Sequence, residues 1–305
     1  MKIVFMGTPE FAAMSLARLY SDKHDIVAVF TQADKPKNRG MKMSASPVKE
    51  LALSNGTPIY QPDTLKDEHV TDLIKSLNCD IIVVVAYGKI LTQQILDIPA
   101  LGCINIHGSI LPKYRGAAPI QHAILNGEKE TGVTSQYVAK ELDSGDVIAV
   151  KKTPIGAYET SADLFNRLAV LGAELLSETL DLISGGKVKR TPQNDAEVTF
   201  APLLSKEISP IDWNDSAISI LNKVRALIPW PVATMELCGE RLKIFKVEIT
   251  DKATAAAPGS TLSAGENGIE VSCSDGTVII KQLQAPGGKK MSASDYLRGK
   301  KHLRV

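Results

Sequence analysis

The stretches DIIVVVA (residues 80–86) and CINIH (residues 103–107) have the pattern of strands buried inside a sheet. Side chains alternate between the two faces of a strand, so Asn105 and His107 project from the same face. The chain turns directly after His107, which places both side chains at the carboxyl end of their strand. Open α/β sheets hold their ligands at this end. An amide donor beside an imidazole suits a reaction that builds negative charge on a carbonyl oxygen and moves a proton.

Each of these two residues also has a plain structural explanation. A histidine at a strand end often does no more than satisfy local hydrogen bonds, and an asparagine there often forms only a cap or a turn. The pair on one face, followed by a Gly-Ser-x-x-Pro loop, favours a functional site as strongly as a structural one.

Strand and helix patterns alternate through the first half of the chain. Strands are also predicted at residues 2–6, 26–30, 133–138 and 147–153. Helices are predicted at residues 9–20, 47–54, 70–77, 90–96 and 161–183. Thr8 is placed to cap the first helix, and residues 31–46 form a polar loop. This order predicts a doubly wound, mostly parallel α/β sheet with right-handed crossovers.

The second part of the chain has a different pattern. A helix at residues 216–228 is followed by short strands at 234–237, 242–249, 269–273 and 277–283. Glycine-containing turns separate these strands and indicate a small antiparallel β-barrel. We therefore expect an α/β domain at residues 1–186, a polar linker at 187–210 and a barrel domain at 211–305.

The composition is that of an ordinary globular protein, with 305 residues of which 44% are hydrophobic. No apolar run approaches the ~18 residues of a membrane span. The start, MKIVFMGTPEF, has the pattern of a first strand rather than a signal peptide. Its turn has one glycine where a dinucleotide site needs three, so NAD and FAD are not expected. The cysteines form no metal-ligand spacing, so we expect reduced thiols, no metal and a packing role for Cys103.

The charge is unevenly distributed although the net charge is only +1. Residues 31–49 hold five basic side chains against Asp34 alone, and residues 281–305 hold seven against Asp295 alone. Either basic segment alone would be an ordinary solvated surface. Two of them on an otherwise acidic chain indicate a polyanionic partner.

A family resemblance extends over nearly the whole chain. Asn105-x-His107, followed by SILP at residues 109–112 and LDSG at 142–145, resembles the formyltransferases that use 10-formyltetrahydrofolate. The closest likeness is to the branch that acts on methionyl-tRNA. Further matching stretches are FMGTPEFA at residues 5–12, VVVAYGKIL at 83–91, NIHGSILPKYRGAAPIQ at 105–121, IDW at 211–213 and PWP at 229–231.

The resemblance implies a set of site residues. The family's catalytic residues fall on Asn105, His107 and Asp143. Asp143 is preferred to Asp146 because its distance along the chain from the histidine matches the family, although its Leu-Asp-Ser-Gly context also fits an ordinary turn. The implied folate-binding residues are Ser109, Ile110, Leu111 and Pro112, with pocket walls from Ala86, Tyr87, Gly88 and Ile90. Ile110 replaces the family's usual leucine, which is a conservative change.

The resemblance also implies a reaction and a partner. A formyl group passes from 10-formyltetrahydrofolate to the α-amino group of methionine on initiator tRNA, for translation initiation. The amine attacks directly, and an oxyanion develops without a covalent enzyme intermediate. The implied tRNA-binding residues are Lys35, Lys37, Arg39, Lys42 and Lys206. The family implies a Rossmann-like catalytic domain, an OB-like tRNA-binding domain, a cytoplasmic location and a monomer.

Other functions fit parts of this pattern. A formyltransferase acting on a small amine, such as a nucleotide-linked amino sugar or glycinamide ribonucleotide, would share the three catalytic residues. So would a folate-dependent hydrolase that uses water as the acceptor. A non-catalytic RNA-binding protein on the same scaffold is a further alternative. The basic segment at 31–49 favours tRNA, and the intact Asn105, His107 and Asp143 favour an enzyme.

Overall fold

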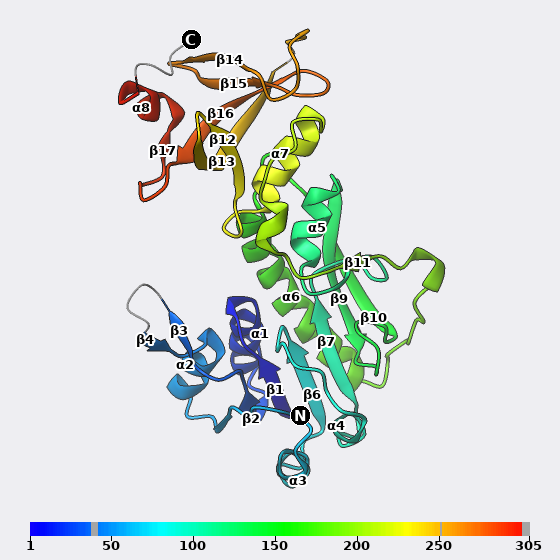
Figure 1. Cartoon of the computed structure of the whole chain (residues 1–305). Helices are drawn as coiled ribbons and strands as arrows, with labels where there is room; N and C mark the ends of the chain where they lie inside the picture. Colours follow the sequence, from blue (N-terminus) through cyan, green and yellow to red (C-terminus); the bar gives the residue numbers. More distant parts are fainter. Residues whose placement is uncertain (38–41, 251, 301–305) are drawn as a thin grey trace. The chain divides into compact units, whose positions relative to one another are not determined.

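The computed structural model describes residues 1–37, 42–250 and 252–300, without the side chains of Lys37 and Lys42, as two compact units (Figure 1). One unit consists of Met1–Pro119, Glu130–Thr153 and Phe165–Ala201. The other consists of Ile120–Lys129, Pro154–Leu164 and Pro202–Val305. The domain limits expected from the sequence, 1–186, 187–210 and 211–305, stay a prediction.

The first unit is built on a seven-stranded sheet in the order β10-β9-β7-β6-β1-β2-β5. Its strands are β1 (Lys2–Gly7), β2 (Asp25–Phe30), β5 (Ile59–Tyr60), β6 (Ile81–Val85), β7 (Cys103–His107), β9 (Glu130–Tyr137) and β10 (Val147–Pro154). The strands from β7 to β5 are parallel, and β9 runs antiparallel to β7. The chain moves outward from β1 to β5 and then returns to β6, so the switch point lies between β1 and β6. The predicted mostly parallel α/β fold is confirmed.

Helices cover both faces of this sheet because its central strands are apolar on both sides. They are α1 (Glu10–Ser21), α2 (Pro47–Ser54), α3 (Glu68–Ser76), α4 (Gln93–Leu96) and α6 (Ser161–Ser184). On one face, Met6 and Ile82 pack with Ile74 of α3 and Ile95 of α4. On the other, α6 approaches β7 so closely that a Cβ on Gly172 would lie 3.1 Å from Ile106 Cγ2. None of the described helices combines the length and the apolar character of a membrane span.

Three local predictions were wrong. Thr8 does not cap α1: Pro9 takes the cap position, and Thr8 Oγ1 donates instead to the carbonyl of Tyr87. The helix predicted at 90–96 begins only after Thr92, whose side chain caps it, so Ile90 lies in an extended segment. The polar loop at 31–46 contains an antiparallel pair, β3 (Lys35–Lys37) and β4 (Lys42–Ser44).

The second unit contains an antiparallel sheet in the order β12-β13-β16-β15-β14, with β17 on β16. Its strands are β12 (Ala233–Leu237), β13 (Glu240–Thr250), β14 (Thr261–Gly265), β15 (Gly268–Ser272), β16 (Thr277–Gln284) and β17 (Met291–Ser292). Its helices are α5 (Pro119–Leu125), α7 (Ala217–Ala226), α8 (Ala293–Arg298) and the 3₁₀ turn η2 (Lys206–Ile208). Sequence patterns missed β14, β17, α5 and α8, which are short or polar.

A cavity in the central sheet should destabilise the first unit strongly. Ile82 of β6 is fully buried, whereas Ile218 of α7 is 45% exposed. We expect Ile82→Ala to lower the free energy of unfolding by about 2–5 kcal/mol, because the emptied space cannot close completely. The matched Ile218→Ala should cost about 1 kcal/mol or less. Denaturant titration followed by circular dichroism measures both, and equal losses would contradict this picture of the core.

Candidate active site

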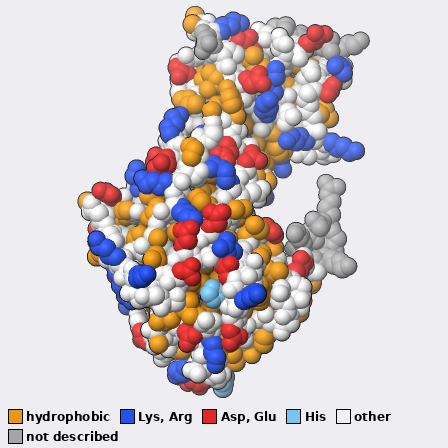
Figure 2. All heavy atoms as spheres, turned by 180° about the vertical axis from the view of Figure 1, so that it is seen from behind, with side chains coloured by type: hydrophobic (Ala, Val, Ile, Leu, Met, Phe, Trp, Pro, Cys, Tyr) orange, Lys and Arg blue, Asp and Glu red, His pale blue; other side chains and the backbone are white. Residues whose placement is uncertain are grey.

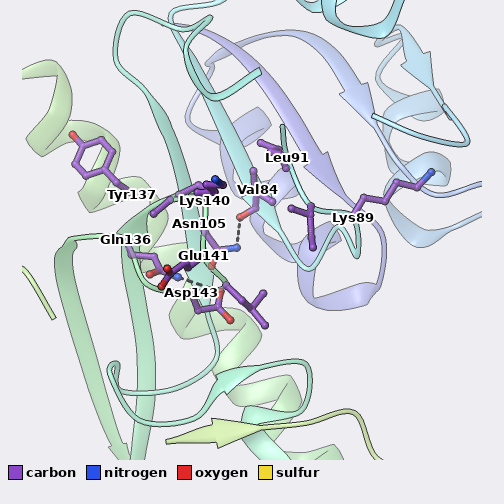
Figure 3. Close-up of a pocket in the computed structure, with 13 residues that line it drawn as sticks. Val84, Lys89, Leu91, Asn105, Gln136, Tyr137, Lys140, Glu141 and Asp143 are labelled. Carbon is purple, nitrogen blue, oxygen red and sulfur yellow. Dashed lines mark hydrogen bonds between the residues drawn. The ribbon is translucent and has the colours of Figure 1, made fainter. Parts of the chain in front are cut away.

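Asn105 and His107 lie at the carboxyl end of β7, beside the switch point of the sheet. A cavity of about 120 Å³ opens next to Asn105 (Figure 3). It is lined by Val84, Lys89, Ile90, Leu91, Asn105 and residues 136–143. Its wall therefore combines the end of β6, the segment that follows β6, and the turn that carries Asp143.

The amide of Asn105 is only partly satisfied by the protein. Its Nδ2 donates to the carbonyl of Val84 at 3.3 Å, which leaves a second N–H on the same nitrogen. Its Oδ1 is buried and has no hydrogen-bond partner among the described residues. A buried polar atom without a partner at the wall of a cavity indicates that a ligand completes its bonding.

His107 is 7% exposed and has a hydrogen-bond acceptor at each ring nitrogen. Nε2 lies 2.9 Å from the carbonyl oxygen of Tyr114, and Nδ1 lies 3.6 Å from Asp143 Oδ2. Nε2 is within hydrogen-bond distance of its neighbour, whereas the distance from Nδ1 to the carboxylate is that of an ion-pair contact. The cavity wall contains Asn105 and Asp143 but, within the described ranges, not His107.

Asp143 sits in a turn with φ +51°, in the left-handed region. Its Oδ2 accepts from the backbone N–H of Gly116 at 2.9 Å, and its Oδ1 accepts from Gln136 Nε2 at 3.3 Å (Figure 3). These contacts, from two other segments, aim the carboxylate at His107. Asp143 is therefore the acidic side chain beside the histidine, the position that the family resemblance gave it.

The Ser109–Pro112 loop is held by β9 rather than exposed to the cavity. Thr134 Oγ1 donates to the carbonyl of Ser109 at 2.7 Å and accepts from the backbone N–H of Leu111 at 3.1 Å. Ser109 and Leu111 are buried, while Ile110 and Pro112 are partly buried. Within the described ranges, none of the four lines the cavity.

The residues that follow β6 divide between the core and the cavity. Ile90 lines the cavity and is 78% exposed. The Tyr87 side chain is 1% exposed and packs in the core, where burial raises its pKa to about 12. Ala86 and Gly88 are exposed and have φ of +44° and +81°. A side chain on Gly88 would overlap Gln32, whose amide donates to the carbonyl of Tyr87 at 2.9 Å.

Two of the predicted tRNA-binding residues have described side chains. Lys35 is exposed and donates to Gln32 Oε1 at 2.6 Å, and Lys206 is exposed in η2 of the second unit. Arg39 lies outside the described residues, and only the backbones of Lys37 and Lys42 are described. Figure 2 shows basic and acidic side chains interspersed over the drawn face of the described residues.

Lys49 has a structural partner instead of a free charge. Its Nζ lies 2.7 Å from Asp34 Oδ2 and donates to Gln61 Oε1 at 2.8 Å. The hydrogen bonds from Lys49 and Gln61 hold the pKa of the Asp34 carboxyl below its ordinary value. The acidic side chain of residues 31–49 is therefore paired with one of the five basic side chains of the same segment.

Sequence reasoning missed Gln136, Gly116 and Gln193, which all contact the Asp143 turn. A signal for Gln136 was available: three consecutive polar residues, Thr134 to Gln136, interrupt a buried strand and are all buried themselves. Buried polar groups in a strand need partners. Thr134 and Gln136 bond the loops of the site, whereas Ser135 bonds β10 and α6. Gly116 and Gln193 gave no comparable signal.

Cys103 lies two residues before Asn105 on the same strand. Burial raises the pKa of the Cys103 thiol to about 12, and Cys103 packs in the core, as predicted. Among the described residues, no three His, Cys, Asp or Glu side chains form a group that could hold a metal ion.

Two sequence profiles match the chain: Formyl transferase over residues 1–180 and Formyl transferase, C-terminal domain, over residues 203–301. The chain belongs to the formyltransferase family. A methionyl-tRNA formyltransferase of Alkaliphilus metalliredigens (strain QYMF) is 47% identical over 299 residues, which cover 98% of this chain and 95% of that protein. Another methionyl-tRNA formyltransferase, of Pseudoalteromonas translucida (strain TAC 125), is 44% identical over 302 residues, which cover 98% of this chain and 94% of that protein. The resemblance found in the sequence is confirmed.

The fold also recurs in solved structures of low sequence identity. The N-formyltransferase from Helicobacter canadensis, in complex with folinic acid and dTDP-3-aminofucose, has a TM-score of 0.69 at 20% identity, covering 92% of this chain and 98% of that one. HypX from Aquifex aeolicus, in complex with tetrahydrofolic acid, has a TM-score of 0.62 at 21% identity. The match covers 97% of this chain and 47% of that one. These likenesses concern the fold.

The turn that carries Asp143 should not tolerate a side chain at Gly145. A Cβ there would overlap the carbonyl oxygen of Tyr137, whereas a Cβ on Gly265 would meet open space. We expect Gly145→Ala to lower the free energy of unfolding by about 1–3 kcal/mol, because backbone must move to admit the methyl group. Gly265→Ala should change it by about 0.5 kcal/mol or less. Denaturant titration measures both free energies of unfolding. Equal losses in the two variants would contradict the tight packing of the Asp143 turn.

Proposed function

We propose that this chain transfers a formyl group from 10-formyltetrahydrofolate to the α-amino group of methionine on initiator tRNA. The observation that carries the proposal is the convergence of Asn105, His107 and Asp143 at the end of β7, in a chain that is 44–47% identical to methionyl-tRNA formyltransferases. The formyltransferase family uses formyltetrahydrofolate, and both profile matches support the same chemistry here.

The cavity suits one part of a folate. A cavity on the order of 150 Å³ admits benzene, so the smaller cavity of about 120 Å³ covers only part of a folate ring and the rest of the ligand lies outside it. Val84, Ile90 and Leu91 give it apolar walls, and the unpartnered Oδ1 of Asn105 gives it a polar contact. When bound, the co-substrate supplies the formyl group.

The proposed mechanism assigns a role to each of the three residues. The acceptor amine attacks the formyl carbon, so negative charge grows on the formyl oxygen. The second N–H of Asn105 donates to that oxygen. His107, when protonated, adds positive charge nearby. Asp143 orients the His107 ring and relays the proton that the amine releases, directly or through water, to N10 of the folate. The bond between N10 and the formyl carbon then breaks, and tetrahydrofolate leaves as the formyl group stays on the acceptor amine.

The acceptor is proposed to be tRNA rather than a small amine. The Helicobacter canadensis enzyme was solved with a nucleotide-linked amino sugar, but it shares only 20% identity with this chain. The relatives at 44–47% identity are methionyl-tRNA formyltransferases. Lys35, Lys37, Arg39, Lys42 and Lys206 would then contact tRNA phosphates. The resemblance further supports a cytoplasmic monomer, and light scattering tests its oligomeric state.

Removing the amide of Asn105 should abolish most of the activity. We expect kcat of Asn105→Ala to fall about 10²–10³-fold, as for the loss of one oxyanion donor. The isosteric Asn105→Asp should fall at least as far, because it replaces the donor with an acceptor. Steady-state formyl transfer measures both, with thermal melting to show that each variant is folded. A folded Asn105→Ala with near-normal turnover would refute this role.

The basic loop should contribute to tRNA binding through charge. We expect Arg39→Ala to raise KM for methionyl-tRNA and to reduce the slope of log KM against log salt, because one phosphate contact is lost. Lys66→Ala is the control, because Lys66 is exposed but lies outside both basic segments. Identical slopes of log KM against log salt for Arg39→Ala and the unmodified chain would contradict the assignment of Arg39 to tRNA binding.

The first experiment compares acceptors for formyl transfer from 10-formyltetrahydrofolate. Methionyl-initiator tRNA, methionyl-elongator tRNA, free methionine and a dTDP-linked amino sugar are supplied to the purified chain in parallel. Transfer to the charged initiator alone would establish the proposed reaction. Transfer to the sugar alone would replace it with the small-amine alternative. Folate binding without any transfer would favour a binding protein on the same scaffold.

A further inference from the structure

Residues 190–201, here named the strap, fall between the two profile matches, which end at 180 and resume at 203. The sequence predicted a linker here, but the strap belongs to the first compact unit. Its first part contains the 3₁₀ turn η1 (Asp195–Glu197), and its last part forms β11 (Phe200–Ala201). Its contacts are with the segments that build the candidate active site.

Backbone hydrogen bonds attach both ends of the strap to these segments. Thr191 exchanges two backbone hydrogen bonds with Val147 of β10, at 2.8 and 3.0 Å. The carbonyl of Thr199 accepts a hydrogen bond from the backbone N–H of Arg115 at 2.9 Å. The strand β11 then pairs in parallel with β8 (Arg115–Gly116). A Cβ on Gly116, whose φ is +124°, would lie 2.7 Å from the carbonyl oxygen of Ala201.

Gln193 makes the polar contacts in the middle of the strap. Its Nε2 donates to the carbonyls of Asp143 and Gly145, both at 2.8 Å, and lies 3.2 Å from Gln136 Oε1. Its Oε1 accepts from Nε and Nη2 of Arg115 at 3.0 and 2.8 Å. A single carboxamide therefore joins the Asp143 turn to the segment around Arg115.

Both ends of this bridge lead to the Asp143 carboxylate. Arg115 precedes Gly116, whose N–H donates to Asp143 Oδ2. The Oε1 of Gln136 accepts a hydrogen bond from Gln193. The Nε2 of Gln136 is therefore the atom that faces Asp143 Oδ1. The side chain of Arg115 is 6% exposed, and a buried guanidinium needs an acceptor. The carboxylate of Asp195 lies 3.7 Å from Arg115 but is 94% exposed, whereas Gln193 is an acceptor within hydrogen-bond distance.

We propose that Gln193 is a positioning residue for formyl transfer, which holds the Asp143 carboxylate against His107 and Asn105 without touching the substrates. The expected effect on the rate of formyl transfer rests on the proposed function. The expected effect on the stability of the Asp143 turn does not. The positioning requires both ends of the carboxamide: the nitrogen fixes the left-handed turn at Asp143, and the oxygen fixes Arg115. Losing either end lets the carboxylate leave the place from which it faces His107.

Two substitutions separate the ends of the bridge. Gln193→Met keeps the length of the side chain and removes both the donor and the acceptor. Gln193→Glu keeps an acceptor for Arg115 but presents a carboxylate to three oxygen atoms, of Asp143, Gly145 and Gln136. Asn194→Ala is the matched control, because the adjacent Asn194 is exposed and bonds only within η1, to Ala196 and Glu197.

The structural consequence is measured by hydrogen exchange on the chain without substrates. Backbone amides in residues 139–147 should exchange about tenfold faster in Gln193→Met, because the turn loses its side-chain bonds. Asn194→Ala should leave them unchanged. Equal exchange in Gln193→Met and the unmodified chain would overturn the proposal whatever reaction the protein catalyses.

The kinetic consequence is measured by formyl transfer to methionyl-initiator tRNA. In both Gln193 variants kcat should fall about tenfold or more, while KM for either substrate changes by less than about threefold, since no substrate contact is removed. In an Asp143→Asn background, Gln193→Met should add less than about twofold. Normal kcat in Gln193→Glu, or a full independent loss in the Asp143→Asn background, would overturn the proposal. An unmodified chain inactive on every acceptor would refute the proposed function and leave the exchange result to decide on Gln193.

Discussion

The contact between the Asp143 carboxylate and the His107 ring depends on bonds from three other residues. Gly116 and Gln136 bond the carboxylate, and Gln193 bonds the carbonyls of Asp143 and Gly145. None of these partners is near Asp143 in sequence except Gln136. The turn has a positive φ at Asp143, which aspartate adopts more readily than most residues other than glycine. The rest of the candidate site is arranged around this held turn.

The parallel sheet explains why the site forms where it does. Buried apolar strands bring the ends of β6 and β7 together, and their polar residues can only appear where the strands stop. Beyond those ends the chain needs partners for buried backbone and side-chain groups. Polar residues inside β9 supply them: Thr134 holds the Ser109–Leu111 loop, and Gln136 holds Asp143. The same strand thus supports both sides of the site.

The geometry of the candidate site suits a reaction that forms no covalent intermediate with the enzyme. The amide of Asn105 has a hydrogen left to donate and an oxygen left to accept, and both lie at a cavity with apolar walls. The thiol nearest in the strand, Cys103, is kept neutral by burial. A site of this kind suits transfer between two substrates that it brings together. The basic residues of the chain would then orient the larger of these substrates.

The sequence by itself determined most of the longer strands, most of the longer helices and the identity of Asn105 and His107. Apolar runs and the alternation of side chains are local properties, and they placed both residues on one face of β7. The family resemblance added Asp143. Only the tertiary structure decided which groups hold that carboxylate, that Lys49 is paired with Asp34, and that residues 190–201 contact the segments around Asp143 and Arg115. The physical reason is that these contacts join residues far apart in the chain, and no local pattern records which distant donor a carbonyl or carboxylate will meet.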